Sequence, residues 1–213
     1  MSRLAIWDLP TRLFHWLVVA LIPALWWTAK QEEMEIHMIL GQVMLGLILF
    51  RIFWGLIGSS TARFSGFVRG PGAILAYLRG TAKPAIGHNP IGALSVLAML
   101  LVLATQVGLG LFAFHDDLAL QGPLAHLVSE ETSETLTDRH ETMFNVVLAL
   151  IGLHLAAILF YLVVRRKNLV GPMVSGKGAA APGAEALTPA PAWRFLLAAS
   201  AAVGLTLWIS SGL

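Results

Sequence analysis

The sequence has no cysteine and few charged residues, and both shortages narrow what the protein can do. Without cysteine, disulfides, thiolate zinc sites, iron–sulfur clusters and covalently attached c-type haem are all excluded. Charged residues make up only 12% of the 213 residues, against about 25% in a typical soluble domain. Hydrophobic residues reach 57%, and the mean hydropathy is +0.75. This composition indicates an integral membrane protein.

Five apolar stretches approach the length that a membrane crossing needs, about 20 residues. They cover residues 13–29, 37–58, 91–114, 141–164 and 193–211. The long apolar run and the "PALWWTAK" that follows it argue against a cleaved signal peptide at residues 1–29. The expected fold is all-α, an integral membrane four-helix bundle with a fifth, C-terminal transmembrane helix. The expected domains are 1–170 for the bundle, 171–192 for a flexible linker rich in Gly, Ala and Pro, and 193–213 for the fifth helix.

Charge is distributed unevenly between the two alternating sets of loops. One set, with the N-terminus, carries twelve of the fourteen basic residues: Arg3, Arg12, Arg51, Arg63, Arg69, Arg79, Lys83, Arg165, Arg166, Lys167, Lys177 and Arg194. The other set holds Lys30, Arg139 and ten acids: Glu32, Glu33, Glu35, Asp116, Asp117, Glu130, Glu131, Glu134, Asp138 and Glu141. The positive-inside rule then places the N-terminus and the linker in the cytoplasm and the C-terminus outside.

Four of the seven histidines lie on or at the ends of these spans: His15, His37, His140 and His154. Titratable residues inside a membrane are costly, so each is a candidate functional residue. For His15 and His37 alone, an interfacial ring bound to water is the competing interpretation. His154 lies in the middle of "LALIGLHLAAILF", where an imidazole needs a partner for at least one nitrogen.

The spacing of these histidines predicts two pairs. His140 and His154 are about 40° apart around a helix and roughly 21 Å apart along it. By depth, His37 pairs with His140 near the outer face, and His15 pairs with His154 nearer the inner face. Zinc would want more ligands than two imidazoles. Haem takes two axial nitrogens on opposite faces, and bundle cores house such cofactors.

Other residues are suited to surround such a cofactor, and each has a simpler alternative. Arg12 and Arg51 could pair with haem propionates, or could be interfacial basic side chains. His88 and Asn89 could contact a quinone or a propionate, or could form a turn that caps a helix. Five glycines could let a porphyrin approach the backbone, or could serve close helix packing: Gly41, Gly46, Gly108, Gly110 and Gly152.

The motifs that carry these residues resemble those of the bacterial cytochrome b561 and nickel-hydrogenase b-type cytochrome family. They are "WDLPTRLFHW", "HMILGQVMLGLILFRIFWG", "GHNPIG" and "HETMFNVVLALIGLH", and the resemblance covers about residues 5–170. It implies two b-type haems in a four-helix bundle, with axial histidines from spans one, two and four. Those positions match His15, His37, His140 and His154. The resemblance also implies a location in the bacterial cytoplasmic membrane, so the outer side on which the charge distribution places the C-terminus is the periplasm.

The function expected from this is electron transfer across the membrane, between quinone and a periplasmic redox protein such as a c-type cytochrome. An acidic outer loop, roughly 115–139, suits a basic partner, although topology alone also explains its charge. The alternatives are a superoxide:quinone oxidoreductase, which would want a basic outer funnel, and the b-type subunit of a membrane-bound hydrogenase. A metal transporter would want carboxylates along its path, and span three has none. Whether the protein is itself an enzyme or an electron-transfer subunit is left open.

Overall fold

The computed structural model describes residues 3–81, 86–115, 120–179 and 186–213. Of the charged loop residues named above, Lys83, Asp116 and Asp117 lie outside this part of the chain. The chain divides into two compact units. The first unit comprises Met1–Phe14, Arg51–Ala98 and Ile151–Ala198, and the second comprises His15–Phe50, Met99–Leu150 and Ala199–Leu213. The long helices run from one unit into the other, so each unit is described by itself.

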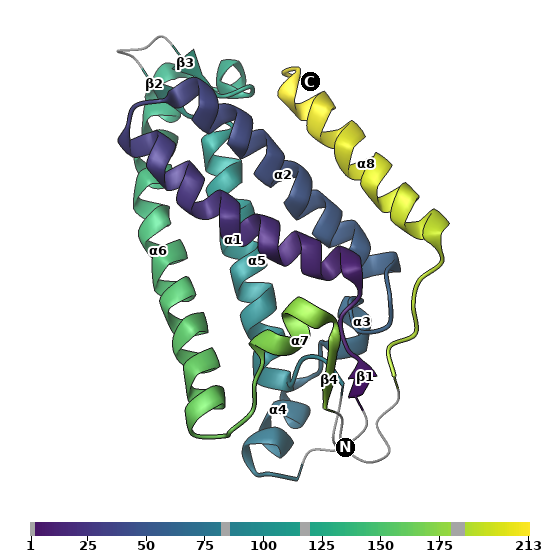
Figure 1. Ribbon diagram of the computed structural model, residues 1–213. Coiled ribbons are helices and arrows are strands. Elements are labelled where there is room, and N and C mark those ends of the chain that lie inside the picture. Colours follow the sequence, from purple (N-terminus) through teal and green to yellow (C-terminus); the bar gives the residue numbers. More distant parts are fainter. Residues whose placement is uncertain (1–2, 82–85, 116–119, 180–185) are drawn as a thin grey trace. The chain divides into compact units, whose positions relative to one another are not determined.

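Five long helices account for the five apolar stretches (Figure 1). They are α1 (Leu9–Lys30), α2 (Met34–Ile57), α5 (Pro90–Gly110), α6 (Glu130–Val163) and α8 (Ala192–Ser210). All five are long and apolar enough to cross a membrane. A helix satisfies its own backbone hydrogen bonds, which is what the hydrocarbon core demands of a spanning segment. The prediction of an all-α membrane protein is confirmed.

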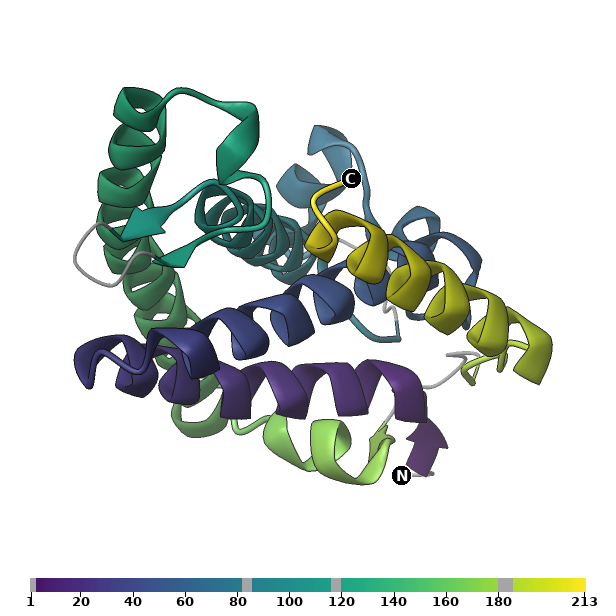
Figure 2. The ribbon, with the colours of Figure 1, turned by 90° about the horizontal axis from the view of Figure 1, so that it is seen from above.

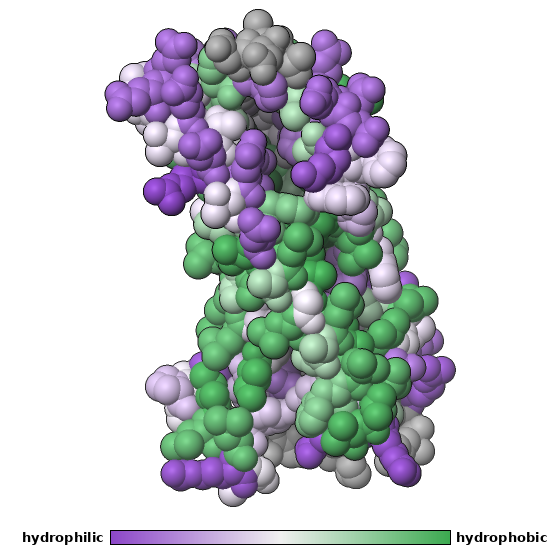
Figure 3. Space-filling view, turned by 90° about the vertical axis from the view of Figure 1, so that its left-hand side faces the viewer, coloured by the Kyte–Doolittle hydropathy of each residue, from purple (hydrophilic) through white to green (hydrophobic). Residues whose placement is uncertain are grey.

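The apolar side chains of these helices point largely outward rather than into a core. Only 6% of the most apolar part of α6 is buried. Figure 3 shows hydrophobic residues gathered over the long helices and hydrophilic ones gathered at helix ends. A soluble protein rarely exposes so large a continuous apolar surface, because water would disfavour it. This apolar surface is therefore suited to contact with lipid.

Helix α6 begins at Glu130, eleven residues before the expected span. The hydroxyl of Ser129 accepts a hydrogen bond from the backbone N–H of Thr132 (3.3 Å), as an N-cap side chain does. Glu130 and Glu131 occupy the first turn, where negative charge is favoured by the helix dipole. His140 therefore lies well inside a continuous helix and not at its start.

The first unit contains the short elements near the N-terminus. Strand β1 (Arg3–Ala5) pairs antiparallel with β4 (Lys177–Ala179), next to α7 (Val170–Ser175), as Figure 1 shows. Two further short helices belong to it, α3 (Phe64–Phe67) and α4 (Pro71–Leu78). The segment expected to be a flexible linker thus contains a helix and a strand, because backbone pairing with β1 gives it a partner that composition does not reveal.

After β4, Leu187 and Thr188 of the expected linker form further hydrogen bonds within the first unit. The backbone N–H of Leu187 donates to the carbonyl of Ala5 (3.1 Å). The hydroxyl of Ser60 accepts from the backbone N–H of Thr188 (2.9 Å), and the N–H of Ser60 donates to the carbonyl of Thr188 (3.1 Å). These bonds lead the chain into α8 along a defined path.

Asp8 and Trp54 organise the interior of the first unit. Asp8 caps α1, because its Oδ1 accepts from the N–H of Thr11 (2.9 Å). Its Oδ2 accepts from the indole N–H of Trp54 (2.9 Å), and Trp54 is only 2% exposed. One carboxylate therefore holds the start of α1 and satisfies the polar atom of the largest fully buried side chain.

The second unit carries a small hairpin of β2 (Phe114–His115) and β3 (Leu120–Gln121), followed by the 3-10 helix η2 (Ala125–Leu127). Figure 2 shows the hairpin beside the upper part of α6. The hydroxyl of Thr137 on α6 accepts from the N–H of Phe114 (3.0 Å). Ser133, also on α6, donates to the carbonyl of Phe112 (2.5 Å). The N-terminal extension of α6 is thus the element that holds this hairpin.

Helix α8 packs on α2 within each unit. In the first unit, the Arg194 guanidinium donates to the carbonyl of Ile57 (3.3 Å), and Phe195 packs edge-to-face against Trp54. In the second unit, a Cβ on Gly46 would lie 3.2 Å from the hydroxyl of Thr206. Gly46 therefore serves close helix packing, one of the two roles considered for it.

Candidate functional site

His37, on the first turns of α2, is oriented by the end of α1. Its Nδ1 donates to the carbonyl oxygen of Leu25 (2.9 Å), and the hydroxyl of Thr28 lies 3.3 Å from the same nitrogen. A carbonyl only accepts, so the hydrogen is on Nδ1 and the lone pair is on Nε2. This is the arrangement of a metal-ligating histidine, whose second nitrogen is held by a backbone carbonyl.

His140 on α6 is held in the same way, by α5. Its Nδ1 donates to the carbonyl oxygen of Gln106 (2.8 Å). The Gln106 side chain donates in return to the carbonyl of His140 (3.0 Å), and its Nε2 lies 3.3 Å from the Nε2 of the ring. The lone pair of His140 is therefore also on Nε2. Gln106 is not among the site residues expected from the sequence, where its one signal is a polar side chain in a span without charged residues.

The two imidazoles form a pair within the second unit. Their ring centroids are 6.1 Å apart, and the ring planes are inclined at 85°. A metal–imidazole bond is about 2 Å long, so two imidazoles on opposite sides of one iron have centroids about 6 Å apart. The spacing and the two Nε2 lone pairs fit a bis-histidine haem iron.

The glycines near this pair fit the same cofactor in different ways. A Cβ on Gly110 would come within 2.9 Å of the Cε1 of His140, so only glycine lets the ring take this position. Gly41 lies one helical turn after His37, on the same face of α2, and a Cβ there would meet nothing within 4 Å. The backbone beside the His140 ring is thus tightly packed, whereas the space beside Gly41 is open.

No group of three or more His, Cys, Asp or Glu side chains gathers as a metal site among the described residues. A haem iron asks the protein for only two ligands, because the porphyrin supplies the other four. The His37–His140 pair therefore suits haem better than it suits zinc.

A family model described as prokaryotic cytochrome b561 matches residues 6–176. The chain belongs to the prokaryotic cytochrome b561 family. Neither the curated proteins nor the solved structures contain a match to it. Membership implies haem b and electron transfer in a membrane, and the matched range confirms the resemblance seen in the motifs. The match ends at Gly176, directly after α7, so α8 lies outside the cytochrome b561 pattern.

The second pair expected of a cytochrome b561, His15 with His154, stays a prediction. His15 belongs to the second unit, where its ring packs edge-to-face against Trp16 with centroids 4.9 Å apart. His154 belongs to the first unit and is half-buried on α6, between exposed Leu153 and Leu155.

The two arginines proposed as propionate contacts have different surroundings in the first unit. The buried Arg51 donates to the carbonyl of Ala62 (3.2 Å), and its guanidinium lies 5.0 Å from the centre of the Phe64 ring. Arg51 therefore holds the loop after α2 against that helix. Arg12 lies against Gly176, whose φ of +78° and missing Cβ make room for the guanidinium. The buried Nε of Arg12 has no hydrogen-bond partner within the described residues.

Asn89 forms the capping turn considered for it. Its Oδ1 accepts from the backbone N–H of Gly92 (2.7 Å), and its Nδ2 donates to the hydroxyl of Tyr161 (2.9 Å). The amide is occupied on both sides, so a direct quinone contact by Asn89 has no observation in its favour. The capping signal was present in the sequence as Asn-Pro before an apolar run.

His88 lies in an aromatic slot of the first unit. Its ring centroid is 4.6 Å from that of Trp7 and 4.6 Å from that of Phe67. Burial, and to a smaller extent the charge of Arg51, lower the pKa of His88 to about 4. Its buried Nδ1 has no hydrogen-bond partner in the part of the chain that the structure describes. His88 is thus a neutral ring with a nitrogen available to a ligand.

Proposed function

We propose that this protein carries electrons across the bacterial cytoplasmic membrane through two b-type haems, between membrane quinone and a periplasmic redox protein. The observation that carries the proposal is the His37–His140 pair, with centroids 6.1 Å apart and each Nδ1 bonded to a carbonyl. Haem, when bound, supplies a one-electron couple that protein side chains lack.

The histidines and their neighbours orient the site and tune it. The carbonyls of Leu25 and Gln106 keep the hydrogens on Nδ1, so the lone pair of each ring is on Nε2, the atom that would ligate the iron. A donated hydrogen bond of this kind also raises the basicity of the ligating nitrogen. Burial among apolar helices excludes water and controls the potential.

His15 and His154 are proposed to hold the second haem. His154 supports this, because an imidazole in the middle of an apolar span is costly unless it serves a ligand. The buried Nε of Arg12 and Nδ1 of His88 support an anion near them in the first unit, because both lack a hydrogen-bond partner among the described residues. A haem propionate is an anion of this kind. Arg51 is the other arginine that we propose as a propionate contact.

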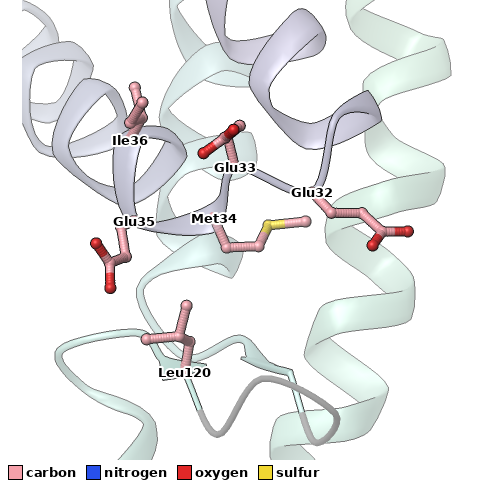
Figure 4. Close-up of a pocket in the computed structure, with 6 residues that line it drawn as sticks. All are labelled: Glu32, Glu33, Met34, Glu35, Ile36 and Leu120. Atoms are coloured by element: carbon pink, nitrogen blue, oxygen red, sulfur yellow. The ribbon is translucent and has the colours of Figure 1, made fainter.

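The proposed outer face is suited to a basic partner. The turn between α1 and α2 borders a cavity of about 400 Å³, and three glutamates line it together with apolar residues, shown in Figure 4: Glu32, Glu33, Met34, Glu35, Ile36 and Leu120. Acidic side chains around an open cavity steer a cationic protein such as a small c-type cytochrome, and they repel an anion such as superoxide. This charge, with the basic residues of the opposite loops, supports an N-terminus in the cytoplasm and a C-terminus in the periplasm.

The test is a visible spectrum and a redox titration of the full-length protein, expressed with an adequate supply of haem. We expect b-type bands and two titrating components. His154→Ala should remove one of them and leave the component that depends on His37 and His140. A protein that folds without haem would overturn the proposal. Loss of both haems from folded His154→Ala would overturn the pairing.

A further inference from the structure

The chain has only two tyrosines, and they are hydrogen-bonded to each other. The hydroxyl oxygens of Tyr77, on α4, and Tyr161, near the end of α6, are 2.5 Å apart in the first unit. Asn89, in the turn before α5, donates to the Tyr161 hydroxyl (2.9 Å). Three elements that are distant in sequence thus direct their polar side chains to one point.

This cluster has one hydroxyl hydrogen more than its own hydrogen bonds use. The backbone N–H of Gly92 can only donate, so it fixes the oxygen of the Asn89 amide on its side and the NH₂ group on the side of Tyr161. The Tyr161 oxygen therefore accepts from Asn89. Of the two hydroxyl hydrogens, one lies in the bond between the tyrosines, and either tyrosine can be its donor. In both cases the second hydroxyl hydrogen has no acceptor among the described residues.

The spare donor is a neutral one. Burial, then the hydrogen bond to Tyr161, raises the pKa of Tyr77 to about 12. The hydroxyl consequently keeps its hydrogen at every physiological pH. A neutral hydroxyl donor suits a neutral acceptor such as a carbonyl oxygen, whereas a phosphate is better served by arginine or lysine.

The elements that carry the tyrosines face lipid. Helix α4 has the apolar sequence PGAILAYL, in which Leu75 and Leu78 are exposed, and Arg69 and Arg79 flank it. An apolar face between basic residues is typical of a helix that lies in the membrane interface. Leu159 and Phe160, beside Tyr161, are exposed as well. A molecule that reaches this donor from the apolar side must itself dissolve in lipid.

We propose that the Tyr77–Tyr161 pair binds a carbonyl oxygen of the membrane quinone headgroup, with Asn89 as the residue that positions Tyr161. This inference rests on the proposed function, because it names the site of the quinone used there. The spare hydroxyl hydrogen is the donor, and the lipid-facing side chains of α4 and α6 accompany the apolar part of the molecule.

The experiment uses the full-length, haem-loaded protein in quinone-free phosphatidylcholine vesicles, with decylubiquinol and menadiol as electron donors. The rate of haem reduction is measured against quinol concentration for the wild type, Tyr77→Phe, Tyr161→Phe and the double variant. One lost hydrogen bond of this kind weakens binding by about tenfold, so the half-saturating quinol concentration of the double variant should rise about tenfold. Each single variant keeps one hydroxyl hydrogen and should show a smaller rise. Thr105→Val is the matched control, because its hydroxyl bonds only within its own helix, to Leu101. It should behave as the wild type.

Each outcome decides between the two proposals. Dithionite should reduce the haems of every variant fully, which shows that cofactor and fold are intact. If quinol reduces the wild type and the tyrosine variants with the same half-saturation, this inference is overturned, a phospholipid is the better occupant, and the proposed function stands. If quinol does not reduce the wild type, the quinone part of the proposed function is overturned together with it.

A second readout separates binding from a structural role. In the infrared difference spectrum of bound decylubiquinone, the carbonyl stretch should move to higher frequency when both tyrosines become Phe, because no hydroxyl hydrogen is then left for that oxygen. An unchanged stretch in the double variant would overturn the inference even if the rates had changed.

Discussion

His37 and His140 lie with their ring centroids 6.1 Å apart, and each donates its Nδ1 hydrogen to a backbone carbonyl of another helix. The carbonyl of Leu25 comes from α1 and that of Gln106 from α5. Four helices therefore take part in a site in which the two proposed ligands come from α2 and α6. Helix α5, which carries neither of these histidines, decides the ring orientation of one of them.

The pairing predicts the effect of removing one ligand. His140→Ala should lower the haem-to-protein ratio from two to one, because a haem held by a single histidine loses half of its axial ligation. The measurement is haem content by absorbance, set against protein concentration. His126→Ala, a substitution on η2, should keep both haems. Full haem content in folded His140→Ala would contradict the assignment of His140.

Gly110 and Gly108 offer a matched pair of substitutions on α5. A Cβ at Gly110 would approach the Cε1 of His140 to 2.9 Å, whereas at Gly108 it would meet nothing within 4 Å. Gly110→Ala should displace the His140 ring at a cost of about 1–3 kcal/mol and weaken binding of that haem. Gly108→Ala should bind haem as the wild type does. Equal haem retention by both variants, measured by transfer to apomyoglobin, would contradict the close packing at Gly110.

Asp8 should be one of the most sensitive polar residues of the first unit. Asp8→Ala removes the N-cap of α1, which costs about 1 kcal/mol. It also removes the hydrogen bond from the buried indole N–H of Trp54 to Oδ2, which costs about 1–3 kcal/mol more. Asp8→Asn has a single acceptor oxygen, so it should keep one of the two bonds and show an intermediate loss. The free energy of unfolding in mixed detergent micelles checks this order, and equal stability of Asp8→Ala and the wild type would refute it.

His88 should make the protein less stable in acid. Its pKa is about 4 in the folded state against an ordinary value of 6.5, so the unfolded chain binds the proton first. The stability that the neutral ring contributes is present above pH 6.5 and is lost as the pH falls towards 4. The neighbours Trp7 and Phe67 do not titrate, and Arg51 stays charged in this range.

His88→Phe is the variant that isolates this effect, because it fills the aromatic slot without a titrating group. The slope of unfolding free energy against pH between 6.5 and 4 should be shallower than in the wild type. A slope in His88→Phe as steep as that of the wild type would assign the acid sensitivity to another group.

The limits of the helices and the structure of the linker differ in how well the sequence predicts them. The apolar runs predicted five spans, and the helices end within a few residues of those limits except at the start of α6. That start was missed because residues 130–140 are polar, and hydropathy registers only the part of a helix that lipid covers. The linker was expected to be flexible, and β4 was missed, because three residues that pair with β1 leave no periodic pattern.

The sequence by itself determined that this is a helical membrane protein of the prokaryotic cytochrome b561 family, because apolar runs of this length are stable in lipid only as helices. It also singled out the four histidines, since imidazoles in such runs are costly. Only the tertiary structure decided which nitrogen of His37 and of His140 is available, that Gly110 packs on an imidazole, and that the two tyrosines meet. The physical reason is that these properties depend on contacts between different helices, and the pattern along one helix does not contain the direction of its neighbour's carbonyls and hydroxyls.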